Sequence, residues 1–162
     1  IPTFKHFPGH GDTAEDSHNG IAVSHESKEE MEICEWRPYE SLSIENCVMV
    51  GHIAAPEITG DLTPASMSYE IVTGILRQQL NFEGVVLTDA LGMGAITNEY
   101  TSAEAAVNAI EAGCDILLCP DDLRESFEAV TESVENGTIS EERINESVYR
   151  ILRLKRMYGL IK

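Results

Sequence analysis

Four short apolar runs recur along the chain, each long enough for one buried strand. They are IPTFKHF (1–7), NCVMVGHI (46–53), GVVLTDA (84–90) and CDILLCP (114–120). Near-continuous apolar runs of this length are typical of parallel strands that are covered on both faces. They return roughly every 30–40 residues, an interval that leaves room for one helix between successive strands.

The segments between these runs carry helical patterns. Residues 69–80 are predicted to form a helix that begins after Ser68 as N-cap and ends at Asn81. Thr101 and Glu104 predict a capping box for the next helix. The first of these helices would turn four apolar residues inward, namely Ile71, Ile75, Leu76 and Leu80.

Two more helices complete the pattern. One covers 123–135 and ends at Asn136 and Gly137, and the last begins after Ser140 and ends at Gly159. The last helix is expected to bury Ile144, Val148, Ile151 and Met157. The alternation of strands and helices predicts an α/β fold with a parallel sheet built from βα units.

The composition is strongly acidic. The 162 residues include 11 Lys and Arg against 28 Asp and Glu, which gives a formal net charge of −17. Such a chain repels phosphate backbones and anionic lipids, so we expect no nucleic-acid partner. Because no apolar run approaches the ~20 residues needed to span a bilayer, we expect no membrane insertion.

The four cysteines suggest neither a metal site nor a disulfide. Cys34, Cys47, Cys114 and Cys119 form no CxxC pair and match no zinc-knuckle spacing. On a strand, Cys114 and Cys119 would lie about 16 Å apart, which is too far for a disulfide. We expect buried free thiols, which favour a reducing compartment.

Polar side chains follow the predicted strands at the points where the strands end. The carboxyl ends of parallel strands share one edge of a sheet or barrel, and ligands bind at that edge. The sequence therefore predicts an active edge. The residues expected there are Lys5, His6, His52, Thr88, Asp89, Asp121 and Asp122.

The stretch KHFPGHGDTAEDSH (5–18) contains three of the five histidines of the chain. Its proline and glycines exclude a regular helix, and the glycine and lysine pattern of a phosphate loop is absent. In a metal-dependent hydrolase, the loop would supply ligands of the types that zinc prefers. These would be His6, His10, Asp12, Asp16 and His18. A solvated surface loop is another interpretation of the same residues.

Acid–base catalysis also fits this stretch. Asp16 lies two residues before His18 and can accept a hydrogen bond from the imidazole, which fixes its tautomer and stabilises its cation. An imidazole held in this way titrates near neutrality, as a group that acts first as acid and then as base requires. Asp89 would be the partner at a facing strand end. Its alternative role is an N-cap for the following helix.

The chain resembles the catalytic domain of glycoside hydrolase family 3, and within it the β-N-acetylglucosaminidases. The resemblance rests on KHFPGHGDTAEDSH, GHI, LTPASMSYEIVTGILRQQLNFEGVVLTDALGMGAI and AVNAIEAGCDILLCP. It covers nearly the whole chain. It is weakest over 26–46, where Arg37, Pro38 and Tyr39 are the residues that fit the family.

This resemblance implies a retaining glycosidase with a covalent intermediate. Asp89 would be the nucleophile that attacks the anomeric carbon, His18 the general acid and then the general base, and Asp16 the residue that orients His18. Most retaining glycosidases use a second carboxyl group as the acid–base. Because His18 need not repel an anion as a carboxylate does, phosphate is a further candidate for the second nucleophile.

The resemblance also implies how the sugar is held. Lys5 and His6 would hydrogen-bond its hydroxyls, and His52 would line the pocket. The expected substrate is a terminal β-linked N-acetylglucosamine, with peptidoglycan fragments as its source, and no metal or other cofactor is expected. Relatives of this kind occur both in the cytoplasm and exported to the wall. The cytoplasm is the expected location here because of the free thiols.

The family's catalytic domain is a (β/α)8 barrel, whereas this chain has about four strand–helix units. The resemblance therefore implies that residues 1–162 are the C-terminal half of that barrel, with no second domain in this chain. A half-barrel leaves two strand edges open, so we expect an isolated fragment to self-associate and to be inactive or nearly so. A non-catalytic carbohydrate-binding fragment is the remaining alternative.

Overall fold

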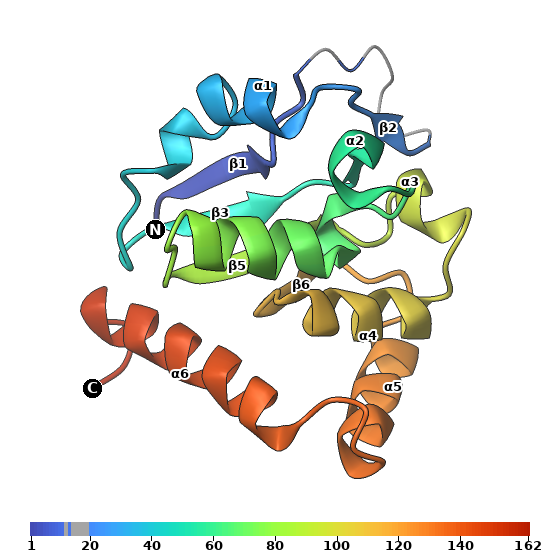
Figure 1. Ribbon diagram of the computed structural model, residues 1–162. Helices are drawn as coiled ribbons and strands as arrows, with labels where there is room; N and C mark the ends of the chain where they lie inside the picture. Colours follow the sequence, from blue (N-terminus) through green and yellow to red (C-terminus); the bar gives the residue numbers. More distant parts are fainter. Residues whose placement is uncertain (12, 14–19) are drawn as a thin grey trace.

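The four predicted strands form one parallel sheet (Figure 1). The computed structural model describes residues 1–11, 13 and 20–162, and its main sheet has the strand order β1-β3-β5-β6. These strands are Thr3–Phe7, Cys47–Val50, Val85–Ala90 and Ile116–Leu118. Two short strands, β2 (Ala22–Val23) and β4 (Ile53–Ala54), form a separate parallel pair. The predicted α/β class with a parallel sheet is confirmed.

Helices connect the strands of the described chain. The α-helices are α1 (Lys28–Ile33), α2 (Pro56–Thr59), α3 (Gly94–Thr97), α4 (Ser102–Ala112), α5 (Leu123–Glu135) and α6 (Glu141–Met157). The 3-10 turns are η1 (Arg37–Tyr39) and η2 (Ala65–Met67), and η3 (Glu70–Gln79) is a π-helix.

Local sequence signals locate several helix ends correctly. The hydroxyl of Thr101 accepts the N–H of Glu104, and the Glu104 carboxylate accepts the N–H of Thr101, so the predicted capping box is present. The Ser68 hydroxyl accepts the N–H of Ile71 at 3.4 Å, but η3 is a π-helix whose N-cap is Tyr69, so the predicted N-cap is wrong by one residue. Asn81 follows η3 with φ of 54°, the left-handed conformation that ends helices.

The inward face of α6 differs from the predicted one. Val148 and Met157 were expected inside, but they are 45% and 41% exposed. Ser147 and Leu154 are buried instead, and Ile151 is partly buried. This side of α6 faces inward because Ser147 and Arg150 hydrogen-bond the buried carboxylate of Asp115, which lies just before β6.

One side of the main sheet is covered by helices over its two central strands. Val48, Val50 and Val86 point to this side and have no exposed surface. They form one apolar cluster with side chains of α1, α4 and η3. Figure 1 shows η3, drawn in green, lying across this side of the sheet. The alternation of the strand residues therefore places a continuous core between the sheet and its helices.

The opposite side is covered near the amino ends of the strands. There Leu154 and Ile151 of α6 pack against Cys47 and Val85. Other residues of this side are partly exposed, namely Met49, Leu87 and Leu118. Within the described residues, β1 and β6 are edge strands of the main sheet. Because parallel sheets are normally covered on both faces, this sheet resembles one part of a larger layered structure.

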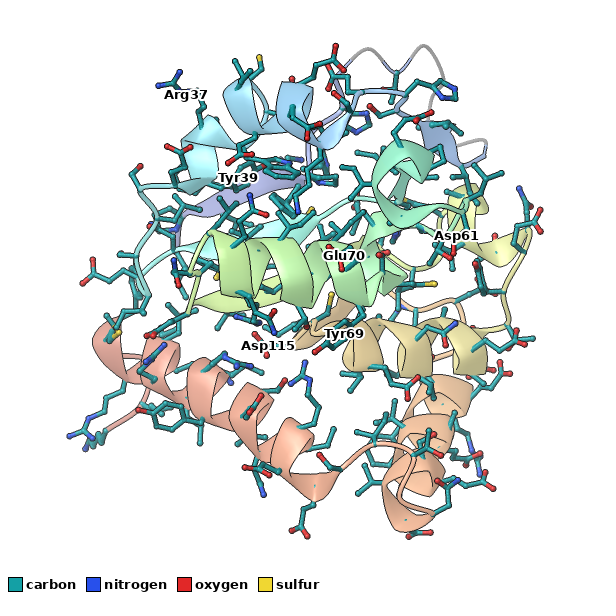
Figure 2. The ribbon with its side chains drawn as sticks, viewed as in Figure 1. Arg37, Tyr39, Asp61, Tyr69, Glu70 and Asp115 are labelled. Atoms are coloured by element: carbon teal, nitrogen blue, oxygen red, sulfur yellow. The ribbon has the colours of Figure 1, made fainter. Side chains whose placement is uncertain are left out.

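A buried carboxylate ties α6 and η3 to the sheet. Asp115 lies just before β6, and its side chain has no exposed surface. Figure 2 shows it between η3 and α6. It accepts hydrogen bonds from Arg77 at 2.6 Å, Ser147 at 2.7 Å, Arg150 at 3.0 Å and the N–H of Val86 at 3.0 Å, and Arg143 lies 3.8 Å away. These partners compensate for the loss of water around the carboxylate.

The cysteines are free, as predicted, but two of them are not buried. Cys47 and Cys114 are buried, whereas Cys34 and Cys119 are exposed. Burial raises the pKa of the Cys114 thiol to about 12, so it stays protonated near neutral pH. Among the described residues, none of the helices combines the length and apolar character needed to cross a bilayer.

Replacement of Asp115 should strongly destabilise the fold. Asp115→Asn leaves three guanidinium groups around a neutral amide, and removal of one partner from a buried ion pair costs about 3–5 kcal/mol. Glu128→Gln removes a carboxylate from the exposed Arg124–Glu128 pair and should cost no more than about 1 kcal/mol. Urea unfolding of the two variants measures this difference. Equal losses would show that the Asp115 cluster does not hold α6.

Candidate active site

The carboxyl ends of β1 and β5 bring together a histidine and a carboxylate. His6 Nε2 lies 3.4 Å from Asp89 Oδ2, although β3 lies between their two strands. β3 ends at Val50 and is followed by Gly51, where an added Cβ would lie 3.1 Å from the Cβ of His6. The absence of a side chain at Gly51 therefore gives His6 room to approach Asp89.

The two carboxylate oxygens of Asp89 have different neighbours. Its Oδ1 accepts the N–H of Ala90 at 2.8 Å, and its Oδ2 faces His6. The side chain is 20% exposed, so a ligand can reach it from solvent. The alternative role as N-cap is wrong, because the next helix, α3, begins after Met93.

His52 is buried and contacts the residue that follows Asp89. Its Nε2 donates to the carbonyl of Ala90 at 3.0 Å, and its Nδ1 lies 2.8 Å from the hydroxyl of Ser66. Burial is the main cause that lowers the pKa of His52, so the ring is neutral near pH 7. A direct hydrogen bond from His52 to a sugar would have to replace one of these two contacts.

Lys5 and His6 also line a small pocket at the end of β1. Its volume is about 260 Å³, and its other lining residues are Phe4, Gly9, His10, Glu35, Pro38 and Tyr39. The rings of His6 and His10 meet edge to face, with centroids 5.3 Å apart. Lys5 is exposed. A charged amine, an imidazole and aromatic rings at one edge are groups that can bind a polyol.

The predicted acid–base pair is not located by the structure. Asp16 and His18 both lie outside the described residues, as does Asp12. Of the five ligands in the metal interpretation, His6 and His10 are described. Within 1–11, 13 and 20–162, no three His, Cys, Asp or Glu residues are grouped so that they could hold a metal ion.

Two of the other polar residues at strand ends, Thr88 and Asp122, make hydrogen bonds that stabilise the fold. Thr88 is buried, and its hydroxyl accepts the N–H of Leu118, which joins β5 to β6. Asp122 is the N-cap of α5. Together with Asp121 it lines a separate cavity of about 550 Å³ beside Tyr100. Strand position alone did not predict the contacts of Gly51 or Ser66.

Comparison with known proteins supplies the decisive observation. Residues 1–154 match the model of the family described as Glycosyl hydrolase family 3 N terminal domain. The chain belongs to glycosyl hydrolase family 3. The predicted resemblance is confirmed, and the match includes both strand ends that carry His6 and Asp89.

Individual relatives from this family agree with that assignment. The chain is 30% identical to Beta-hexosaminidase A of Pseudoalteromonas piscicida, over 96% of this chain and 30% of that protein. A family 3 beta-N-acetylglucosaminidase structure from Paenibacillus sp. str. FPU-7 superposes with a TM-score of 0.89 at 40% identity, over 95% of this chain and 30% of that one. The Beta-glucoside phosphorylase BglX gives a TM-score of 0.89 at 34% identity, over 98% and 30% of the two chains. This chain therefore spans about a third of the length of these relatives.

Proposed function

We propose that this chain is part of a retaining β-N-acetylglucosaminidase whose nucleophile is Asp89. The observation that supports this most directly is the partly exposed Asp89 carboxylate facing His6 at the carboxyl edge of a parallel sheet. Ligands of α/β barrels bind at that edge. Relatives named as beta-hexosaminidases support the type of substrate, a terminal β-linked N-acetylglucosamine. Peptidoglycan fragments are the proposed natural source.

The reaction proceeds in two displacements. A carboxylate oxygen of Asp89 attacks the anomeric carbon while His18 donates a proton to the leaving glycosidic oxygen, and a covalent glycosyl-enzyme forms. His18, now neutral, takes a proton from water, which attacks the same carbon and releases Asp89. Asp16 orients the imidazole of His18. Two inversions at one carbon give overall retention of configuration.

Lys5 and His6 hold the sugar in this proposal. His6 contributes to two parts of the site. One ring nitrogen faces Asp89 Oδ2, and the residue also lines the pocket at the end of β1. A cation at Lys5 donates to sugar hydroxyls without competing for the anomeric carbon. The free thiols support a reducing compartment, the cytoplasm, for this reaction.

A complete site requires further barrel units in this proposal. Three observations support them, namely two sheet edges with no neighbouring strand among the described residues, one partly covered sheet face, and a chain that spans about a third of its relatives. Large apolar side chains on α5 and α6 are also exposed, including Leu123 at 72% and Phe127 at 70%. Preceding βα units would cover these surfaces and add sugar-binding residues.

Replacement of the nucleophile should abolish turnover. In a polypeptide that contains this chain and the rest of the barrel, Asp89→Asn should lower kcat on an aryl β-N-acetylglucosaminide about 10³-fold or more, because an amide is a poor nucleophile. Glu128→Gln makes the same charge change on exposed α5 and should keep normal turnover. An aryl β-glucoside tests sugar preference.

Other outcomes of this assay would contradict the proposal. Normal turnover by Asp89→Asn would show that another residue is the nucleophile. Hydrolysis that depends on added zinc would favour the metal-dependent hydrolase. Efficient turnover of the glucoside, with none of the acetamido sugar, would overturn the proposed substrate.

Phosphorolysis is a second candidate, supported by the similarity to the Beta-glucoside phosphorylase BglX. In that reaction a phosphate oxygen replaces water, attacks the anomeric carbon of the glycosyl-enzyme and releases the Asp89 carboxylate. The expected product in phosphate buffer is an N-acetylglucosamine 1-phosphate. Identical, purely hydrolytic products with and without phosphate would exclude this candidate.

The 162-residue chain on its own should be inactive or nearly so, and it should self-associate. Open strand edges and exposed apolar helix faces favour pairing with another copy. Sedimentation velocity over a range of concentrations measures the association, and the same aryl substrate measures turnover. A monomer with near-normal turnover would contradict both expectations.

A further inference from the structure

His52 is the buried histidine among the four that the structure describes. It is 1% exposed, and it follows Gly51 at the end of β3. Its two hydrogen-bond partners come from segments that are distant in sequence, namely η2 and the end of β5. Burial of an imidazole carries a desolvation cost, which the hydrogen bonds at both of its nitrogens offset.

The partners of the ring define its protonation. A backbone carbonyl can only accept, so the proton on the Ala90 side belongs to Nε2. In the neutral ring Nδ1 is then an acceptor, and the Ser66 hydroxyl donates to it. Two charged or titratable groups face this ring, Asp89 and His6, and their effects on it oppose each other. The imidazole therefore acts as a fixed, uncharged hydrogen-bond bridge.

The hydrogen-bond bridge from His52 ends at Ala90, whose N–H orients the proposed nucleophile Asp89. Ala90 accepts from His52 through its carbonyl and donates to Asp89 Oδ1 through its N–H. The pairing of β5 with β6 is irregular just before this point, with a register shift between Leu87 and Ala90. Beyond this shift, the N–H groups of Leu91 and Gly92 donate to the carbonyls of Leu118 and Cys119, so the β6 side holds the residues after Ala90. His52 holds the Ala90 carbonyl itself from the β3 side.

We propose that His52 is a positioning residue that holds the Ala90 backbone so that Asp89 Oδ2 points at the anomeric carbon. The inference rests on the proposed function and deepens it. In this role His52 transfers no proton and does not bind the sugar. Ser66 is its support, because the hydroxyl fixes the rotation of the ring.

The test separates positioning from binding and from folding. In the barrel-complete polypeptide, His52→Leu should lower kcat on the aryl N-acetylglucosaminide about 10²-fold, because a nucleophile misplaced by about 1 Å loses that much. KM should change little, since the sugar contacts remain. His52→Gln, which restores an N–H donor, should recover about tenfold of the loss. The exposed His25→Gln is the matched control and should behave as wild type.

Each result bears on one part of the inference. A loss confined to KM would make His52 a sugar-binding residue, and unchanged kcat in a folded His52→Leu would overturn the inference. If that variant does not fold, Ser66→Ala keeps the imidazole and should still lower kcat several-fold at constant KM. Wild-type kcat in Ser66→Ala would then overturn it. An inactive wild-type barrel would refute the proposed function itself, which distinguishes the two failures.

Discussion

The neutralisation of Asp115 is the interaction on which the arrangement of the elements depends. A fully buried carboxylate is unstable unless charged or hydrogen-bonding groups replace its water. Here Arg77 comes from η3, Arg143 and Arg150 come from α6, and the N–H of Val86 comes from β5. A single side chain thereby sets the position of two helices relative to the sheet. This cluster lies at the amino ends of the strands, which leaves the carboxyl ends available for chemistry.

At the carboxyl edge of the sheet, the arrangement depends on how closely side chains from different strands can approach each other. His6 reaches Asp89 across an intervening strand because Gly51 leaves the space open. His52, the next residue along, turns inward and contacts the backbone that follows Asp89. The two residues after β3 therefore have different roles. Gly51 leaves space for His6 because it has no side chain, and His52 contacts Ala90 through a buried polar ring. The apolar core beneath them makes both positions rigid.

Much of this architecture could be predicted from local sequence. Continuous apolar runs identified the parallel strands, and Thr101 with Glu104 identified a helix start, because both signals depend on neighbouring residues alone. The inward face of α6 could not be predicted in the same way. Apolar spacing suggested Val148 and Met157, but the partner of the helix is a carboxylate far away in sequence.

The candidate site was predictable to a similar extent. Strand ends placed His6, Asp89 and Asp122 at one edge of the sheet without distinguishing among them. The structure brings His6 to Asp89, whereas Asp122 caps a helix. The contact between His52 and Ser66 has no sequence signal, since hydrogen bonds between loops depend on tertiary structure. Asp16 and His18 lie outside the described residues, so their roles rest on the family resemblance and stay predictions.

The strand order of the main sheet has a consequence for synthesis on the ribosome. Because β1, β3, β5 and β6 are neighbours in the order in which they are translated, each strand can pair with its predecessor as soon as it emerges. The hydrogen bonds to Asp115 are incomplete at that stage. Arg77 is already present, but Arg150 is made 35 residues after Asp115. The full set of hydrogen bonds to this carboxylate therefore forms only after α6 has left the exit tunnel.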